Sequence, residues 1–250
     1  MAFIDAPSPN HDARDPLKPV SLLILHYTGM ESAAAALNRL RDPAAKVSAH
    51  YMIDEDGRIF RLVPEDRRAW HAGVSFWAGE RDINAISIGI ELVNPGHPHP
   101  GYAGGYRPYP EAQMRSLEAL AADILRRHGI PRHRVLGHSD VAPMRKIDPG
   151  ELFDWERLAA RGIGIMPRRG HPVPPGPASS QGMTGPMVAA LQRDLARFGY
   201  DVPATGIHDD ATRQVVAAFQ RHFRRSRVDG VADPVTRGAL ADLLLQLGDG

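Results

Sequence analysis

The sequence contains no cysteine. This absence excludes disulfides, a thiol nucleophile, iron–sulfur clusters and every zinc site that uses a thiolate ligand. Any transition metal must therefore be held by histidine, aspartate or glutamate, and the 12 histidines supply candidates.

Neither sign of charge dominates the chain, and no long apolar run interrupts it. Thirty basic and 29 acidic residues leave no global field that would attract nucleic acid, so we expect no nucleic-acid partner. No apolar run approaches the roughly 18 residues of a transmembrane helix, so we expect no membrane insertion. The N-terminus lacks the pattern of a secretory signal, which predicts a cytoplasmic protein. A periplasmic or envelope location is the alternative if a native signal precedes this sequence.

Residues 162–184 are rich in residues that break helices and strands. Five prolines and five glycines fall in this stretch, which predicts a linker that is semi-rigid where prolines cluster. The predicted organisation is a first domain at 1–161, the linker at 162–184 and a second, smaller domain at 185–250.

The first domain alternates strand and helix patterns. The pattern predicts an α/β fold with a mixed central sheet flanked by helices. The expected strands are 20–25, 85–93, 135–136 and a hairpin formed by 49–53 and 58–63, and the expected helices are 32–41 and 111–128.

The second domain contains an internal repeat. Thr205–Arg213 recurs as Asp229–Arg237, and Ala189–Arg193 upstream recurs as Ala217–Arg221. Two such units, each unable to bury its apolar face alone, predict a small all-α domain of three helices. No set of residues suited to acid–base catalysis recurs within this domain, so we expect a binding role rather than a catalytic one.

Three polar residues stand at or near the ends of predicted strands. They are His26, His138 and Asp148. Two neutral imidazoles and one carboxylate suit a catalytic zinc site, which takes three protein ligands and leaves a position for water. The three residues form no local motif, so their spacing alone also leaves open a structural or surface role for each histidine.

Six sequence blocks follow one another along the first domain: Leu-His-Tyr-Thr-Gly, Ser-Ala-His-Tyr, Ala-Trp-His-Ala-Gly, Ser-Ile-Gly-Ile-Glu-Leu-Val-Asn, Gly-His-Ser-Asp-Val-Ala-Pro and Lys-Ile-Asp-Pro-Gly. In this order they resemble zinc N-acetylmuramoyl-L-alanine amidases, in the amidase-2 or peptidoglycan-recognition superfamily. The resemblance covers about residues 18–160, and residues 184–248 resemble the peptidoglycan-binding domain 1 family.

The resemblance implies roles for individual residues. His26, His138 and Asp148 fall on the zinc ligands, Glu91 on the general base, and Lys146 on the residue that steadies the transition state. Independently, a carboxyl group in the apolar run around Glu91 is expected to have a raised pKa. The compact ammonium group of Lys146 suits a single developing oxyanion.

The resemblance also suggests contacts with substrate. His71, Trp77 and Asn84 are candidate substrate-binding residues, and a structural role is the alternative for each. The Gly/Pro/Tyr-rich loop that follows Glu91, with His97 and His99, is expected to border the substrate groove rather than to bind metal.

The function implied is a zinc hydrolase that cuts the amide bond between N-acetylmuramic acid, or its 1,6-anhydro form, and L-alanine of the stem peptide. Peptidoglycan fragments (muropeptides) would be its partners. The alternative is a non-catalytic peptidoglycan receptor, although such relatives are expected to lose zinc ligands. A serine esterase is disfavoured because the Gly-x-Ser-x-Gly elbow is absent. The sequence carries no signal for an oligomeric state.

Overall fold

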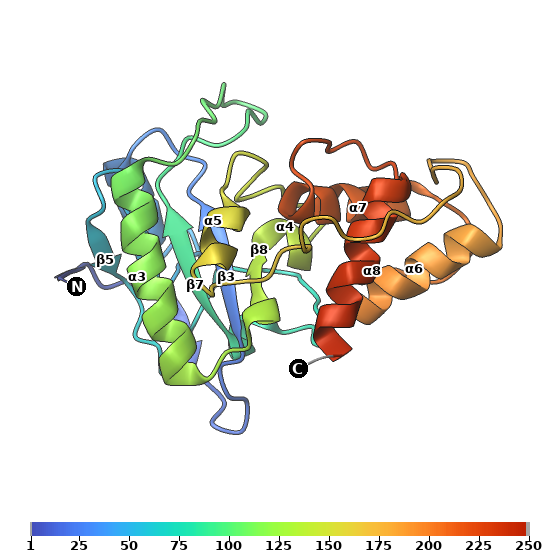
Figure 1. Ribbon diagram of the computed structural model, residues 1–250. Helices are drawn as coiled ribbons and strands as arrows, with labels where there is room; N and C mark the ends of the chain where they lie inside the picture. The colour runs from blue at the N-terminus through green and yellow to red at the C-terminus, as the bar shows by residue number, and fades with distance from the viewer. Residues whose placement is uncertain (1, 249–250) are drawn as a thin grey trace.

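The computed structural model describes residues 2–248, in which a sheet-containing domain lies beside a helical module (Figure 1). The central sheet has six strands in the order β1-β5-β4-β7-β3-β8. These strands are β1 (Phe3–Asp5), β3 (Leu22–Tyr27), β4 (Tyr51–Ile53), β5 (Ile59–Arg61), β7 (Ser87–Leu92) and β8 (Val135–Gly137). Strands β4 and β5 pair antiparallel, as the predicted hairpin requires, and the other neighbours are parallel. The prediction of a mixed sheet is confirmed.

One face of the sheet is covered by helix α3 (Glu111–His128), which lies in front of the strands in Figure 1. Its residues Leu117, Leu120 and Ile124 are fully buried against the sheet in one apolar cluster. The helix ends at Gly129, whose left-handed backbone (φ 64°) lets its N–H bond to the carbonyl of Leu125. This helix has the bounds predicted from the sequence. Helix α5 (Trp155–Ala160) extends the same layer.

The opposite face is covered by helix α1 (Ala33–Arg41), short helices and loops. The predicted strand 85–93 begins later than expected, because Ile83–Ile86 form the short helix α2. The remaining short elements are the 3-10 helix η1 (Arg132–Arg134), helix α4 (His138–Val141) and a small antiparallel sheet of β2 (His11–Ala13) and β6 (Arg67–Ala69). Strands β2 and β6 were missed because they are three residues long and lack an alternating apolar pattern.

The C-terminal module consists of three helices, as predicted: α6 (Pro186–Phe198), α7 (Asp210–Phe223) and α8 (Pro234–Gly248). The repeat has a structural meaning. Buried Gln192 accepts from the N–H of Gly206 (2.8 Å) and donates to the carbonyl of Ile207 (2.9 Å). Gln220 makes the equivalent bonds to Gly230 (2.8 Å) and to the carbonyl of Val231 (2.9 Å). Each copy therefore uses one glutamine to fix its own loop.

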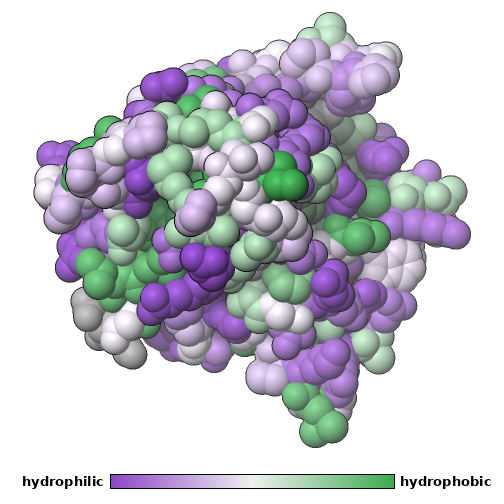
Figure 2. Space-filling view, turned by 90° about the vertical axis from the view of Figure 1, so that its right-hand side faces the viewer, coloured by the Kyte–Doolittle hydropathy of each residue, from purple (hydrophilic) through white to green (hydrophobic). Residues whose placement is uncertain are grey.

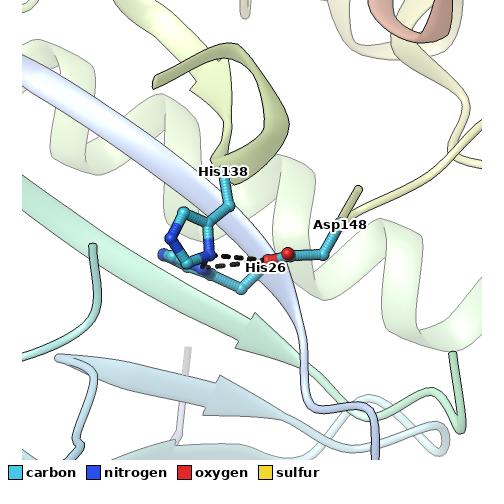
Figure 3. Close-up of side chains that lie close together, drawn as sticks. All are labelled: His26, His138 and Asp148. Carbon is cyan, nitrogen blue, oxygen red and sulfur yellow. Dashed lines mark hydrogen bonds and ion pairs between the residues drawn. The ribbon is translucent and has the colours of Figure 1, made fainter. Parts of the chain in front are cut away.

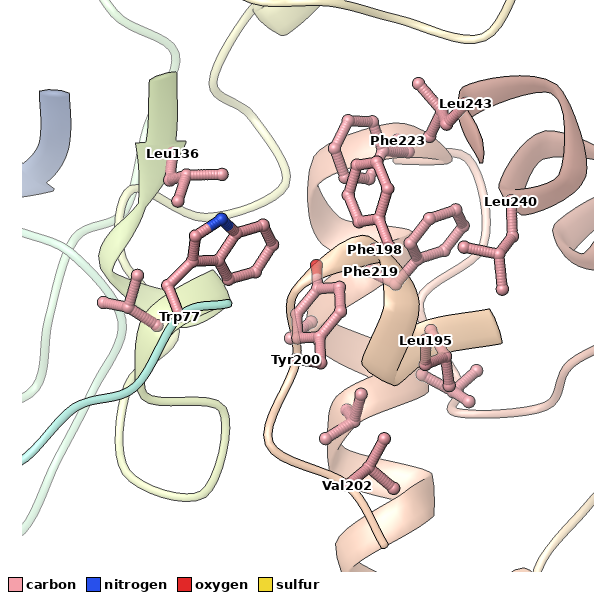
Figure 4. Packing of buried hydrophobic residues seen from close by; sticks show 14 of the residues in the cluster. Trp77, Leu136, Leu195, Phe198, Tyr200, Val202, Phe219, Phe223, Leu240 and Leu243 are labelled. Atoms are coloured by element: carbon pink, nitrogen blue, oxygen red, sulfur yellow. The ribbon is translucent and has the colours of Figure 1, made fainter. Parts of the chain in front are cut away.

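The two parts share one apolar core. Trp77 of the first domain is 2 % exposed and packs edge-to-face against Phe198 and Tyr200 of the module (Figure 4). Residues 162–184 form no helix or strand beyond isolated bridges, and Arg168 in this segment pairs with Asp242 of α8 at 2.7 Å. The module is thus docked rather than loosely tethered; the domain limits themselves stay a prediction.

Apart from this docking face, the module presents a mixed surface. Figure 2 shows hydrophilic and hydrophobic residues interspersed on the side of the molecule where the module lies. The exposed large hydrophobic residues of the module include Ile207 and Leu245, which are far apart in its sequence. Among the described residues, no helix is both long enough and apolar enough to span a bilayer.

Candidate metal and catalytic site

The register of the sheet brings three of the predicted site residues together. In the parallel pair β3 and β7, His26 lies directly opposite Glu91, and Leu25 lies opposite Gly137 of β8. His138, which follows Gly137, therefore lies next to His26. Because side chains alternate between faces, Glu91 and His26 share the face opposite α3, while Ile90 points into the α3 core.

His26, His138 and Asp148 converge on one point (Figure 3). The Nδ1 atoms of the two histidines are 3.0 Å apart, and they lie 3.2 and 3.0 Å from Oδ2 of Asp148. Tetrahedral zinc with bonds of about 2.0–2.1 Å would hold its ligand atoms about 3.3 Å apart. The three residues are only 1–6 % exposed, so their side chains are buried. Donor types, spacing and burial all fit a metal ion.

The protonation states of the cluster also suit a metal. Burial, and to a lesser extent the nearby His138, lower the pKa of His26 to about 4, so its imidazole is neutral at pH 7. Burial alone would raise the pKa of Asp148, but His138 and His26 outweigh it and hold that pKa well below its usual value. The cluster therefore offers a neutral imidazole at His26 and a carboxylate at Asp148, the forms that metals bind.

Glu91 lies beside this cluster, opposite His26 in the sheet, and one of its carboxyl oxygens has no hydrogen-bond partner. Its Oε2 is buried and makes no hydrogen bond to any of residues 2–248. Burial raises the pKa of Glu91 well above its usual value; the charge of Asp148 adds to this and Lys146 opposes it. The raised pKa agrees with the expectation from the sequence, and a buried carboxyl group of this kind is a candidate for general acid–base catalysis.

The cavity has a volume of about 790 Å³, within the range of sites for small ligands. Its wall contains all five residues predicted for metal binding and catalysis, including Lys146, which is partly exposed. His97 and His99 of the Gly/Pro/Tyr-rich loop also line it, as expected from the sequence. In that loop, Nδ1 of His97 lies 3.2 Å from the hydroxyl oxygen of Tyr27, and Nε2 of His97 lies 3.1 Å from Oε1 of Glu151.

Of the three residues predicted to contact substrate, one lines the cavity and two do not. His71 lines the cavity, but both of its ring nitrogens are engaged inside the protein, with His26 (3.0 Å) and with Ser87 (3.1 Å). Trp77 does not reach the cavity, because it lies in the core shared with the module. Asn84 is 6 % exposed and bonds to backbone N–H groups. Neither Trp77 nor Asn84 lines the cavity, and the substrate-binding roles of all three residues stay predictions.

The sequence analysis missed some residues of the cavity wall. Trp70 and Arg39 both line it. Trp70 stands directly before His71 in the Ala-Trp-His-Ala-Gly block, so that block carried a signal for it. Arg39 lies in the amphipathic helix α1, where nothing in the local pattern separates a cavity residue from a solvated one.

Comparison with known proteins identifies the same two families that the sequence resembles. The family Amidase_2 (N-acetylmuramoyl-L-alanine amidase) matches residues 16–151, and the peptidoglycan-binding family PG_binding_1 matches residues 184–240. The chain is 39 % identical over 236 residues to the N-acetylmuramoyl-L-alanine amidase AmiD of Escherichia coli (strain K12), covering 91 % of this chain and 83 % of AmiD.

Two solved structures extend the similarity to three dimensions. One is E. coli AmiD in complex with the substrate anhydro-N-acetylmuramic acid-L-Ala-D-gamma-Glu-L-Lys, with a TM-score of 0.80 and 37 % identity over 92 % of this chain and 91 % of that one. The other is AmpDh3 from Pseudomonas aeruginosa, with a TM-score of 0.79 and 33 % identity over 99 % of this chain and 100 % of that one.

Proposed function

The chain belongs to the Amidase_2 family of N-acetylmuramoyl-L-alanine amidases, and from this membership and the site geometry we propose how it acts and on what. It is a zinc hydrolase that cleaves the amide bond between N-acetylmuramic acid, or its 1,6-anhydro form, and L-alanine of peptidoglycan stem peptides. The convergence of His26, His138 and Asp148 beside Glu91, in one cavity, is the observation that carries this proposal.

Zinc is the metal that best suits this donor set. His26 and His138 would bind it through Nδ1, and Asp148 through Oδ2, which are the atoms that face one another. When bound, zinc polarises the scissile carbonyl and lowers the pKa of water to about 7.

The chain's own residues supply the remaining chemistry of amide hydrolysis. The Glu91 carboxylate accepts the proton of the attacking water and returns it to the leaving nitrogen of L-alanine. Lys146, on the same cavity wall, places its ammonium charge where negative charge develops on the carbonyl oxygen.

The substrate class follows from the relatives and the cavity. The AmiD structure, and a second structure of AmpDh3 in complex with an anhydromuramic pentapeptide, hold an anhydromuramyl peptide. The cavity here is large enough for a sugar joined to part of a peptide. The docked module adds a peptidoglycan-binding surface that raises the local concentration of substrate. The cytoplasmic location stays a prediction, which cell fractionation tests.

Digestion of purified muropeptides and of intact sacculi, followed by mass analysis, tests the proposal. We expect release of free stem peptides beginning with L-alanine, loss of this release after treatment with a chelator, and its recovery when Zn²⁺ is added back. Binding of muropeptides without any cleavage, by protein that lacks stoichiometric zinc, would instead identify a receptor and overturn the proposal.

A further inference from the structure

The two histidines of the metal cluster turn their second ring nitrogens to two consecutive residues. Nε2 of His26 lies 3.0 Å from Nδ1 of His71, and Nε2 of His138 lies 3.1 Å from the carbonyl oxygen of Ala72. One dipeptide, His71–Ala72, thus contacts both imidazoles from behind the cluster.

The hydrogen bonds behind His71 determine the tautomer of His26. The hydroxyl of Ser87 donates to the carbonyl of Ile83 at 2.6 Å, so its oxygen is left to accept from Nε2–H of His71 at 3.1 Å. The Nδ1 atom of neutral His71 is then an acceptor, and Nε2–H of His26 donates to it. His26 is left with its Nδ1 lone pair directed at His138 and Asp148.

The tautomer of His138 is determined more simply. A carbonyl oxygen only accepts, so Nε2 of His138 carries the proton that is donated to Ala72. Nδ1 of His138 then presents its lone pair to the same point as Nδ1 of His26. Both imidazoles are held in the form in which Nδ1 can bind a metal.

The dipeptide is itself held by one buried side chain. Oδ1 of Asn84, in helix α2, accepts from the N–H of His71 (3.1 Å) and from the N–H of Ala72 (2.8 Å). Gly89 in strand β7 has no side chain and so leaves room for the imidazole of His71. A Cβ atom at Gly89 would lie only 2.5 Å from Cγ of His71. Asn84 is 6 % exposed, and its amide oxygen thus fixes the backbone that carries both acceptors.

We propose that Asn84 is a positioning residue for the metal site, acting through His71 and Ala72 to fix the tautomer and orientation of both metal-binding imidazoles. This inference rests on the proposed function insofar as that function assigns a metal to the cluster. Outer-shell partners of metal ligands contribute about 10- to 100-fold to metal affinity, and one amide here supports two ligands.

Substitutions of Asn84 test the proposal through metal affinity, measured without substrate by competition of Zn²⁺ with a chelator. We expect Asn84→Leu, which removes the acceptor, to weaken Zn²⁺ binding by about 10- to 100-fold. Asn84→Asp keeps an oxygen acceptor for both N–H groups, and we expect binding close to that of the wild type. The visible spectrum of the Co²⁺-loaded protein should change in Asn84→Leu and be restored in Asn84→Asp, because it reports ligand geometry.

Gln113 offers a matched control in the same domain. It is also a buried amide, and it donates to the backbone carbonyls of Ile53 and Val93 (2.9 and 3.0 Å), away from the cluster. We expect Gln113→Leu to destabilise the metal-free fold and to leave Zn²⁺ affinity unchanged. Equal loss of affinity in Gln113→Leu and Asn84→Leu would reduce Asn84 to a general stabilising role and overturn the inference.

Substitutions of His71 provide a second test if Asn84→Leu does not fold. In His71→Asn the amide oxygen can take the place of Nδ1, so we expect near wild-type Zn²⁺ affinity, whereas His71→Leu should weaken it about 10-fold or more. Wild-type affinity in the Leu variants overturns this inference alone. Wild-type protein that binds Zn²⁺ but cleaves no muropeptide overturns the proposed function alone, and wild-type protein that binds no metal overturns both.

Discussion

The hydroxyl of Tyr200, in the module, donates a hydrogen bond of 2.7 Å to Oδ1 of Asp140, two residues after His138 of the metal cluster. The other oxygen of Asp140 accepts from the N–H of Gly137 (2.7 Å) and lies 2.7 Å from Nδ1 of His222. Asp140 is 1 % exposed, so these partners replace the water that its carboxyl group loses. The module is therefore hydrogen-bonded to the same short helix, α4, that carries His138 of the candidate metal site.

Replacement of Tyr200 by phenylalanine tests this contact. Tyr200→Phe leaves a buried acceptor with one donor fewer, and we expect the free energy of unfolding to fall by about 1–3 kcal/mol. Urea denaturation measures the change. Tyr102→Phe, at a partly exposed tyrosine on the cavity wall, serves as the control and should unfold like the wild type. Equal stability of Tyr200→Phe and the wild type would show that the hydroxyl contact contributes nothing.

Replacement of Trp77, in the shared core, and of Trp70, on the cavity wall, should have different effects on stability and on substrate binding. Trp77→Ala should reduce the free energy of unfolding by about 3–5 kcal/mol, because it opens a cavity between domain and module. Trp70→Ala, at the partly exposed cavity wall, should instead raise KM for muropeptides with a smaller effect on stability. Thermal denaturation and steady-state kinetics of both variants check this. A reversed pattern would favour the substrate-binding role predicted for Trp77.

Glu91→Gln separates catalysis from folding. The variant cannot transfer a proton, so we expect kcat to fall by about 10²- to 10⁴-fold while the zinc content stays at the wild-type level. Stability should not decrease, because the replaced carboxyl group is buried with an unsatisfied oxygen. Amidase assays and metal analysis measure the two effects.

Glu118 provides the matched control for Glu91. It is another buried glutamate, 8 % exposed, but it forms an ion pair with Arg157 outside the cavity. Glu118→Gln should lower stability and retain kcat. Full amidase activity in Glu91→Gln would contradict the role proposed for Glu91.

Glu65 should make stability depend on acid pH. Burial alone would raise the pKa of Glu65, but hydrogen bonds from Arg127, His128 and Tyr51 outweigh it and lower that pKa to about 2. A pKa below the unfolded value of 4.5 means that the ionised carboxylate stabilises the fold above pH 4.5, and that this contribution is lost as the pH falls towards 2.

Glu65→Gln tests this dependence. At pH 7 we expect the variant to be less stable than the wild type by about 1–3 kcal/mol, and the difference to shrink steadily as the pH falls from 4.5 towards 2. Glu55→Gln breaks a more exposed ion pair with Arg107 and should cost less than about 1 kcal/mol. Urea titrations across this pH range provide the measurement. A difference that grows on acidification would have the wrong sign.

Local patterns predicted the regular elements well and the short ones poorly. Helix α3 has the bounds expected from its apolar period and from Gly129, because both signals lie within a few residues of the helix. The second half of helix α2, residues 85–86, was included in the predicted strand 85–93, since these residues also fit an alternating pattern. What makes Ile83–Ile86 helical is in part a hydrogen bond from Ser87 to Ile83, which periodicity does not reveal.

The amino-acid sequence by itself determined the available chemistry: without cysteine, a metal site had to use histidine and carboxylate. The resemblance of its ordered blocks to the amidase family implied that His26, His138 and Asp148 are the ligands. Only the tertiary structure decided what stands behind these residues. It placed Trp77 in the core shared with the module, and it engaged the amide oxygen of Asn84 with two backbone N–H groups. Burial, and the hydrogen bonds behind the two histidines, arise between segments far apart in the chain, and no local pattern encodes which segments will meet.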